Sequence, residues 1–98
     1  MDDIRFEWDP AKARENLRKH GVSFDEAKTV FADDQAILLD DPDHSAHEDR
    51  FALLGLSAPL RLLVVAHCSR EADSAIRLIS ARKATRSERA QYDAQGNL

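Results

Sequence analysis

The stretch AIRLISARKATRSERAQY, residues Ala75 to Tyr92, decides the fold, because a strand pattern changes into a helix pattern within it. Side chains of a strand point alternately to its two faces. This alternation places Ile76, Leu78 and Ser80 on one face, and Arg77, Ile79 and Ala81 on the other. Thr85 and Glu88 have the Thr-x-x-Glu spacing of a capping box, which begins a helix. The turn is therefore predicted at Arg82 to Ala84.

Cationic side chains gather at this junction, namely Arg77, Arg82, Lys83 and Arg86. Guanidinium groups brought close together repel one another unless an anion binds, and their paired donors match the geometry of phosphate. The start of a helix adds free N–H groups and a positive dipole end. The junction therefore predicts a phosphate site. The alternative is a set of solvated surface charges, with Arg77 paired to a nearby carboxylate.

Length and composition predict one folded domain over residues 1–98, with 43% hydrophobic residues, three Gly and three Pro. The formal net charge of −4 argues against a protein that simply coats nucleic acid. The charge is uneven, however. Residues 1–50 hold 14 acidic and 7 basic side chains, and residues 51–98 hold 4 acidic and 7 basic ones, so the halves carry −7 and +3.

The cysteine content and the N-terminus predict a cytoplasmic protein. Cys68 is the single cysteine, so no internal disulfide forms, and a buried structural role is favoured over a nucleophilic one. The opening MDDIRFEWDP lacks the apolar core of a signal peptide. No run approaches the roughly 18 apolar residues of a membrane span, so no membrane partner is expected.

The N-terminal third predicts a strand followed by two helices. Ile4, Phe6 and Trp8 alternate with charged residues, as in a strand with one apolar face. Asp9 and Pro10 are a strong helix start, and Gly21 ends that helix after His20. Ser23-x-x-Glu26 opens a second helix that ends near Phe31. His20 is a candidate general acid or base, or alternatively a cap of the helix C-terminus.

A very polar segment, DDPDHSAHEDR, follows the short apolar strand expected at Ala36 to Leu39. Asp40, His44 and His47 are a conceivable metal set, but the segment lacks the spacing and central glycine of a calcium loop and a second ligand cluster. An exposed acidic loop is the favoured interpretation, and no metal site is predicted.

The second half of the chain predicts three antiparallel strands. Phe51 to Leu56 and Leu60 to Cys68 are apolar runs separated by a turn, and a second turn leads to the strand that begins at Ala75. The tail from Gln91 loses its amphipathic pattern and is expected to fray. The pattern is that of an α+β domain, in which helices cover part of a sheet.

The order of several motifs resembles the BrnT family, the toxins of BrnT/BrnA type II toxin–antitoxin modules. The motifs span nearly the whole chain and read FEWDPAKARENLRKHGVSFDEA, HEDRFALLG, LRLLVVAH and IRLISARKATRSERAQY. The resemblance implies a RelE-like α+β fold, in which an N-terminal strand and a helical hairpin pack on a small antiparallel sheet and a C-terminal helix follows. It also implies a ribosome-independent ribonuclease without a cofactor that inhibits translation. The implied partner is a BrnA-like antitoxin with a ribbon-helix-helix part, through which alone the complex contacts DNA.

Polar positions that match the family's motifs are candidates for the site. Metal-free RNA cleavage needs a base for the 2′-OH, an acid for the leaving oxygen and cations for the phosphate. Glu48 is the candidate base, and Arg77, Arg82 and a supporting Arg50 are candidates for the phosphate. The acid is sought among Lys19, His20 and Tyr92. Further RNA contacts are expected from Lys19, Ser80, Lys83, Arg86 and Tyr92.

Three alternatives stay open from the sequence. Glu48 and Arg50 would also suit an ordinary cross-strand salt bridge. The basic face would equally serve a module that binds RNA or protein without catalysis, since fold alone does not fix chemistry. It would also serve as the surface on which an acidic or amphipathic antitoxin segment docks.

Overall fold

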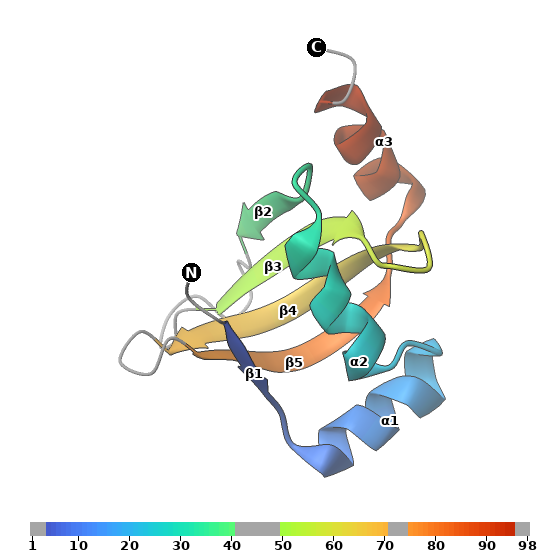
Figure 1. Cartoon of the computed structure of the whole chain (residues 1–98). Coiled ribbons are helices and arrows are strands. Elements are labelled where there is room, and N and C mark those ends of the chain that lie inside the picture. Colours follow the sequence, from blue (N-terminus) through green and yellow to red (C-terminus); the bar gives the residue numbers. More distant parts are fainter. Residues whose placement is uncertain (1–3, 41–49, 71–74, 96–98) are drawn as a thin grey trace.

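The computed structural model describes residues 4–40, 50–70 and 75–95 of the chain (Figure 1). Its elements are, in order, β1 (Arg5–Glu7), α1 (Pro10–His20), α2 (Phe24–Ala27), the 3-10 helix η1 (Lys28–Ala32), β2 (Ile37–Asp40), β3 (Arg50–Leu56), β4 (Leu62–Arg70), β5 (Ala75–Lys83) and α3 (Arg86–Gln95). This α+β architecture confirms the predicted class. No helix in the described ranges is long and apolar enough to cross a membrane.

The strands form a five-stranded sheet in the order β1-β5-β4-β3-β2. Strands β2 to β5 pair antiparallel, and the pairing of β3, β4 and β5 confirms the predicted three-stranded meander. Strand β1, however, pairs with β5 in the parallel sense, so the sheet is mixed rather than wholly antiparallel. A parallel pair needs a long connection, and here most of the chain lies between the two strands.

The start and end of α1 follow the predicted capping chemistry. Asp9 Oδ1 accepts a hydrogen bond from the Ala11 N–H at 2.9 Å, and Pro10 is the first helical residue. Gly21 adopts the left-handed conformation at φ 68°, and its N–H donates to the Leu17 carbonyl at 2.9 Å. Both ends of this helix are thus set by local sequence.

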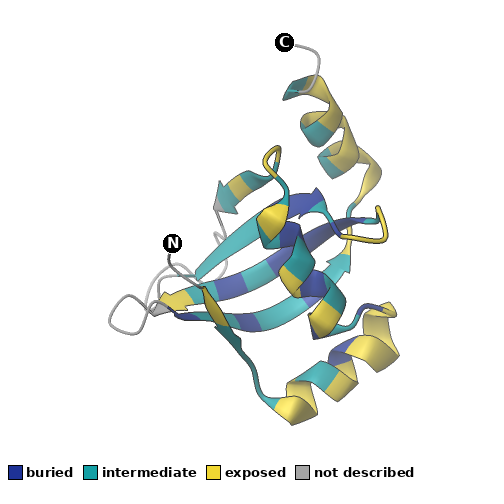
Figure 2. Ribbon diagram, viewed as in Figure 1, coloured by how far each residue is buried: buried dark blue, intermediate teal, exposed yellow. Residues whose placement is uncertain are grey.

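Helices α1, α2 and η1 cover one face of the sheet, in front of it in the view of Figure 1. The buried residues between these layers appear dark blue in Figure 2. They are Val22, Phe24, Ala27, Val30, Leu63, Val65, Leu78 and Ala81. Trp8 packs edge-on against Phe24, with 5.8 Å between the ring centroids. This cluster is the main core.

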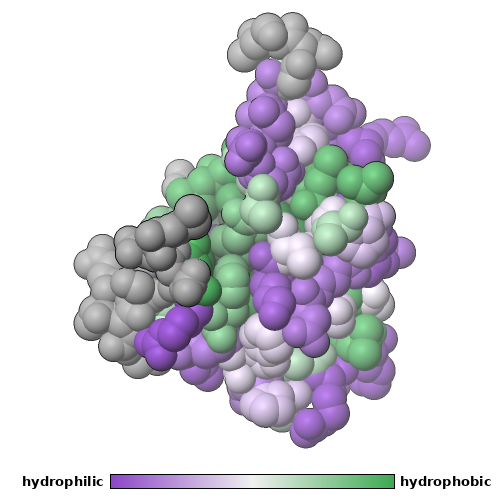
Figure 3. Space-filling model, viewed as in Figure 1, coloured by the Kyte–Doolittle hydropathy of each residue, from purple (hydrophilic) through white to green (hydrophobic). Residues whose placement is uncertain are grey.

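A smaller core lies on the opposite face of the sheet, beside α3. It consists of Leu54, Leu62 and Val64, with Ala84 and Tyr92 among the side chains packed against it. Helix α3 has no buried residue, and its surface is mainly hydrophilic in Figure 3. A few contacts therefore hold this helix to the sheet.

The alternation predicted for β5 is wrong beyond Leu78, because the strand contains an irregularity. Leu78 pairs with His67, but the next residue of β4, Ala66, pairs with Ser80, so Ile79 is an extra residue. A bulge of this kind shifts every later side chain to the other face. Arg77, Ser80 and Arg82 consequently share one face of the sheet, and Ile76, Leu78 and Ala81 share the other.

The predicted ends of several elements also need correction. Strand β5 continues to Lys83, so Arg82 and Lys83 lie in the strand rather than in a turn. Helix α3 continues to Gln95 instead of fraying from Gln91. Only the first turn of the predicted second helix is α-helical, because the chain tightens into η1 from Lys28.

Candidate functional site

Strands β3 and β5 place cationic side chains on the face of the sheet opposite α1. Arg50 of β3 and Arg77 of β5 are both in register with Cys68 of β4, so the three side chains form one cross-strand row. Ser80 and Arg82 follow on the same face of β5. We call this set, Arg50, Arg77, Ser80 and Arg82, the arginine face. The bulge at Ile79 makes this set possible.

Arg77 is paired with a carboxylate of the neighbouring strand. Its Nη1 lies 3.5 Å from Glu7 Oε2, and Glu7 is in register with Arg77 across the β1–β5 pair. The side chains are 41% and 39% exposed, so water screens this pair and the guanidinium stays accessible. This is the pairing expected under the surface-charge alternative.

Arg82 makes a closer ion pair with Glu88 at the start of α3. Its Nη1 and Nη2 donate to the two carboxylate oxygens at 2.8 and 2.9 Å. The hydrogen bonds from Arg82 lower the pKa of Glu88 to about 2, with a further contribution from the Thr85 N–H, although burial opposes the shift. The same bond raises the pKa of Arg82. The pair therefore stays ionised over the whole physiological range.

Arg77 and Arg82 stand at separate places along β5. Their partners on β4, Cys68 and Val64, are four residues apart, which corresponds to about 13 Å along a strand. Each guanidinium is paired with a different carboxylate, one on β1 and one on α3. The two arginines therefore flank Ser80 on either side.

A hollow of about 170 Å³ lies between α1 and the outer edge of β5. It brings together Lys19, His20 and Ser80, which the sequence placed in one site. Its other lining residues are Lys12, Glu15, Asn16 and Ile79. Sequence reasoning missed Lys12 and Glu15, although Lys12 precedes Asn16 by four residues and Glu15 precedes Lys19 by four, which puts them on one side of the helix.

His20 and Leu17 of α1 are both exposed. His20 is the last residue of α1, and Gly21 provides the cap at that end. Lys19 and His20 therefore face solvent at the rim of the hollow. Glu15 is ion-paired with Arg18, which lowers the pKa of Glu15, and both side chains are at least half exposed.

Tyr92 makes a structural contact. Its hydroxyl donates to Asp33 Oδ2 at 2.6 Å, and its ring packs against the smaller core. Burial, followed by the hydrogen bond to Asp33, raises the pKa of Tyr92 to about 12. The hydroxyl thus links α3 to the segment before β2.

The remaining predicted residues lie at the ends of the arginine face or beyond the described ranges. Lys83 ends β5 and Arg86 begins α3, and both are exposed. Glu48, the candidate base, lies outside the described residues, as do His44 and His47 of the alternative metal set. Among the residues that the structure describes, no group of three or more His, Cys, Asp or Glu side chains could hold a metal ion.

Comparisons with known proteins identify the family. The profile of the ribonuclease toxin BrnT, of type II toxin–antitoxin systems, matches residues 8–88. The crystal structure of the ribonuclease toxin BrnT from Brucella abortus superposes with a TM-score of 0.66 and 22% sequence identity, over 86% of this chain and 100% of that one. At this identity the likeness concerns the fold alone. The comparison with curated proteins gave no match. Because the family profile covers most of its length, the chain belongs to the BrnT family of ribonuclease toxins of type II toxin–antitoxin systems.

Proposed function

We propose that this chain is a single-domain, cytoplasmic endoribonuclease of RelE-like architecture that needs no metal ion and inhibits translation by cleaving RNA. The observation that carries the proposal is the arginine face with the hollow at its edge, where Lys19 and His20 lie beside Ser80. Three guanidiniums on one side of a sheet provide the fork-shaped donors that phosphodiesters bind. Lys19 and His20 line the hollow together with Ser80, which belongs to the arginine face.

The reaction is a transesterification within the RNA. A base takes the proton of a 2′-OH, the oxygen attacks the adjacent phosphorus, and the bond to the 5′-oxygen breaks as an acid protonates that oxygen. The products are a 2′,3′-cyclic phosphate and a 5′-OH. Arg77 and Arg82 stabilise the charge on the phosphates, with support from Arg50. Because about 13 Å separates Arg77 from Arg82 along the strand, we assign them to different phosphates of one RNA strand.

We assign the acid and the base of this reaction from the positions of the candidate side chains. Glu48 is two residues from Arg50 in sequence, and we retain it as the base. His20 is the best-placed acid, because it lines the hollow with Lys19 and Ser80. The Tyr92 hydroxyl already donates to Asp33, which leaves it poorly suited to the same role. Lys19, Ser80, Lys83 and Arg86 contact the RNA backbone, and Tyr92, which is partly exposed, remains a candidate RNA contact.

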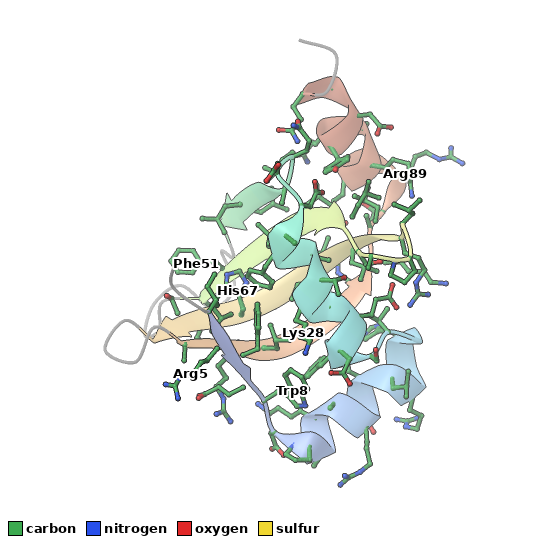
Figure 4. All side chains as sticks on the ribbon, viewed as in Figure 1. Arg5, Trp8, Lys28, Phe51, His67 and Arg89 are labelled. Atoms are coloured by element: carbon green, nitrogen blue, oxygen red, sulfur yellow. The ribbon has the colours of Figure 1, made fainter. Side chains whose placement is uncertain are left out.

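Replacing Arg77 and Arg82 singly by alanine tests the proposal. Each variant should lower kcat/KM for RNA. We expect about 100-fold or more for the arginine that contacts the scissile phosphate, since its loss removes charge stabilisation from the transition state, and a smaller effect for the one that contacts a neighbouring phosphate. The matched control is Arg89→Ala, because Arg89 of α3 is exposed and points into solvent (Figure 4). The parent should keep its activity in EDTA and leave 2′,3′-cyclic phosphate ends. Full activity of both variants would refute the phosphate assignment.

The ion pairs of the arginine face support a second candidate function. Arg77 and Arg82 are each paired with a carboxylate of the chain itself, Glu7 and Glu88. On a binding surface of this kind, an anion of the ligand takes the place of the internal carboxylate. A non-catalytic module would bind RNA or an acidic protein segment there without cutting it. Incubation with end-labelled RNA separates the two functions, because binding alone retains the RNA at full length.

The family implies an antitoxin, and we propose a BrnA-like ribbon-helix-helix protein that covers the arginine face. Covering Arg77 and Arg82 would deny phosphate access, and the DNA contacts of the complex would come from the antitoxin. A pull-down of the product of the neighbouring gene should weaken with salt and with the Arg77→Ala variant. Capture that is unaffected by salt and by the Arg77→Ala variant would show that the antitoxin binds elsewhere.

A further inference from the structure

The geometry of the Arg82–Glu88 pair leaves one edge of the guanidinium unused. The carboxylate takes one N–H each from Nη1 and Nη2, at 2.8 and 2.9 Å. Nη1 donates its second hydrogen to the Lys83 carbonyl at 3.2 Å. Among the described residues, the Nε–H and the second hydrogen of Nη2 have no acceptor. These two donors form the side edge of the guanidinium, a second fork that suits an oxyanion.

Glu88 is itself held in place from two directions. Its Oε1 accepts the Thr85 N–H at 2.8 Å, and its own N–H donates to Thr85 Oγ1 at 3.1 Å. The Ala84 N–H donates to the Leu62 carbonyl at 2.9 Å, which fixes the link between β5 and α3. The Glu88 side chain is 17% exposed, whereas that of Arg82 is 42% exposed. A fixed, mostly buried carboxylate thus holds an accessible guanidinium.

We propose that Glu88 is a positioning residue that orients the free side edge of Arg82 toward RNA phosphate, an inference that rests on the proposed function. An unrestrained arginine loses much rotamer freedom when it binds an anion. The end-on pair with Glu88 imposes this order before the ligand arrives, and the bulge at Ile79 sets Arg82 on the same face as Arg77 and Ser80. Glu88 contacts no substrate and acts through Arg82.

Inorganic phosphate is the first probe, because its binding does not depend on cleavage. In an NMR titration of the full chain, the Arg82 Nε–H resonance should shift as phosphate is added. Glu88→Gln should weaken this binding about two- to tenfold, because the ordering of the side chain is then lost on binding. The matched control is Asp25→Asn, which removes the same charge from an exposed residue, 79% exposed, whose only described ion pair is with Lys28. It should bind phosphate like the parent.

A double-mutant cycle separates positioning from a merely structural role. Glu88→Gln should raise KM for RNA in the parent background and have no effect on KM in the Arg82→Ala background. Thermal unfolding of each variant reports folding separately. An unmoved Nε–H resonance, equal phosphate affinity of Glu88→Gln, or an effect of Glu88→Gln that persists without Arg82 would each overturn the proposal. Phosphate binding as expected, in a protein that cleaves no RNA, would instead refute the nuclease function and leave the positioning role standing.

Discussion

Asn16 of α1 makes hydrogen bonds to both backbone groups of Ala81 in β5. Its Nδ2 donates to the Ala81 carbonyl at 2.9 Å, and its Oδ1 accepts the Ala81 N–H at 3.0 Å. Strand β1 pairs with β5 only from Ala75 to Arg77, so beyond it the side-chain amide takes the place of a neighbouring strand. This contact also forms one wall of the hollow at Lys19, His20 and Ser80.

Replacement of Asn16 by alanine should destabilise the fold. Asn16 is 5% exposed, and its amide also donates to the Val22 carbonyl at 2.9 Å, so its loss leaves buried backbone groups without partners. We expect the free energy of unfolding in urea to fall by about 3 kcal/mol. The exposed neighbour Arg14→Ala is the control and should change stability by less than about 0.5 kcal/mol. A loss below about 1 kcal/mol for Asn16→Ala would show that the edge contact is dispensable.

Gly55 of β3 should not tolerate a side chain. A Cβ there would lie 2.9 Å from Val30 Cγ1, 3.0 Å from Ala36 Cβ and 3.1 Å from Asp33 Oδ2. Asp33 also accepts the Leu56 N–H at 2.8 Å, so it has little room to move. Gly55→Ala should therefore lower the free energy of unfolding by about 1–3 kcal/mol, the usual cost of overpacking. Ala52→Gly, in the same strand, tests the opposite change, the removal of a methyl group. Equal stability of Gly55→Ala and the parent would contradict the prediction.

His67 should make stability fall as the solution becomes mildly acidic. Burial lowers the pKa of this imidazole in the folded chain, although a contact of its Nδ1 with the Val65 carbonyl opposes the shift. Phe31 and Phe51 enclose the ring, with centroids 4.9 and 6.0 Å away, and Figure 4 shows Phe51 beside His67. The folded state thus prefers the neutral ring, and the stabilisation is present above pH 6.5 and lost as pH falls below it.

Urea unfolding at pH 7.5 and pH 5.5 measures this dependence. The variant His67→Leu should be less stable than the parent at pH 7.5, because aromatic contacts are lost, but its stability should change less between the two pH values. The exposed His20→Ala variant should keep the dependence of the parent. The same pH dependence in His67→Leu and the parent would assign the effect to other groups.

The sequence predicted local structure better than it predicted which residues meet. Capping residues such as Asp9, Gly21 and Thr85 act on neighbours a few positions away, and all three lie where the sequence placed them. The face of Ser80 was wrong because a bulge depends on pairing with β4, which no local pattern records. Likewise, the Asn16 contact joins residues 65 positions apart. The cationic junction was visible in the sequence, whereas its ion pairs with Glu7 and Glu88 were visible only in three dimensions.

His20 should supply the proton of the leaving group, as its place in the hollow indicates. The variant His20→Ala should lower kcat for RNA about 10²- to 10⁴-fold, the usual contribution of a general acid, with a smaller effect on KM. Because the side chain is exposed at the end of α1, stability should change little. The decisive substrate carries sulfur in place of the 5′-oxygen, because a thiolate leaves without protonation. His20→Ala should cleave this substrate almost as fast as the parent does, and an equal loss on both substrates would remove His20 from the role of acid.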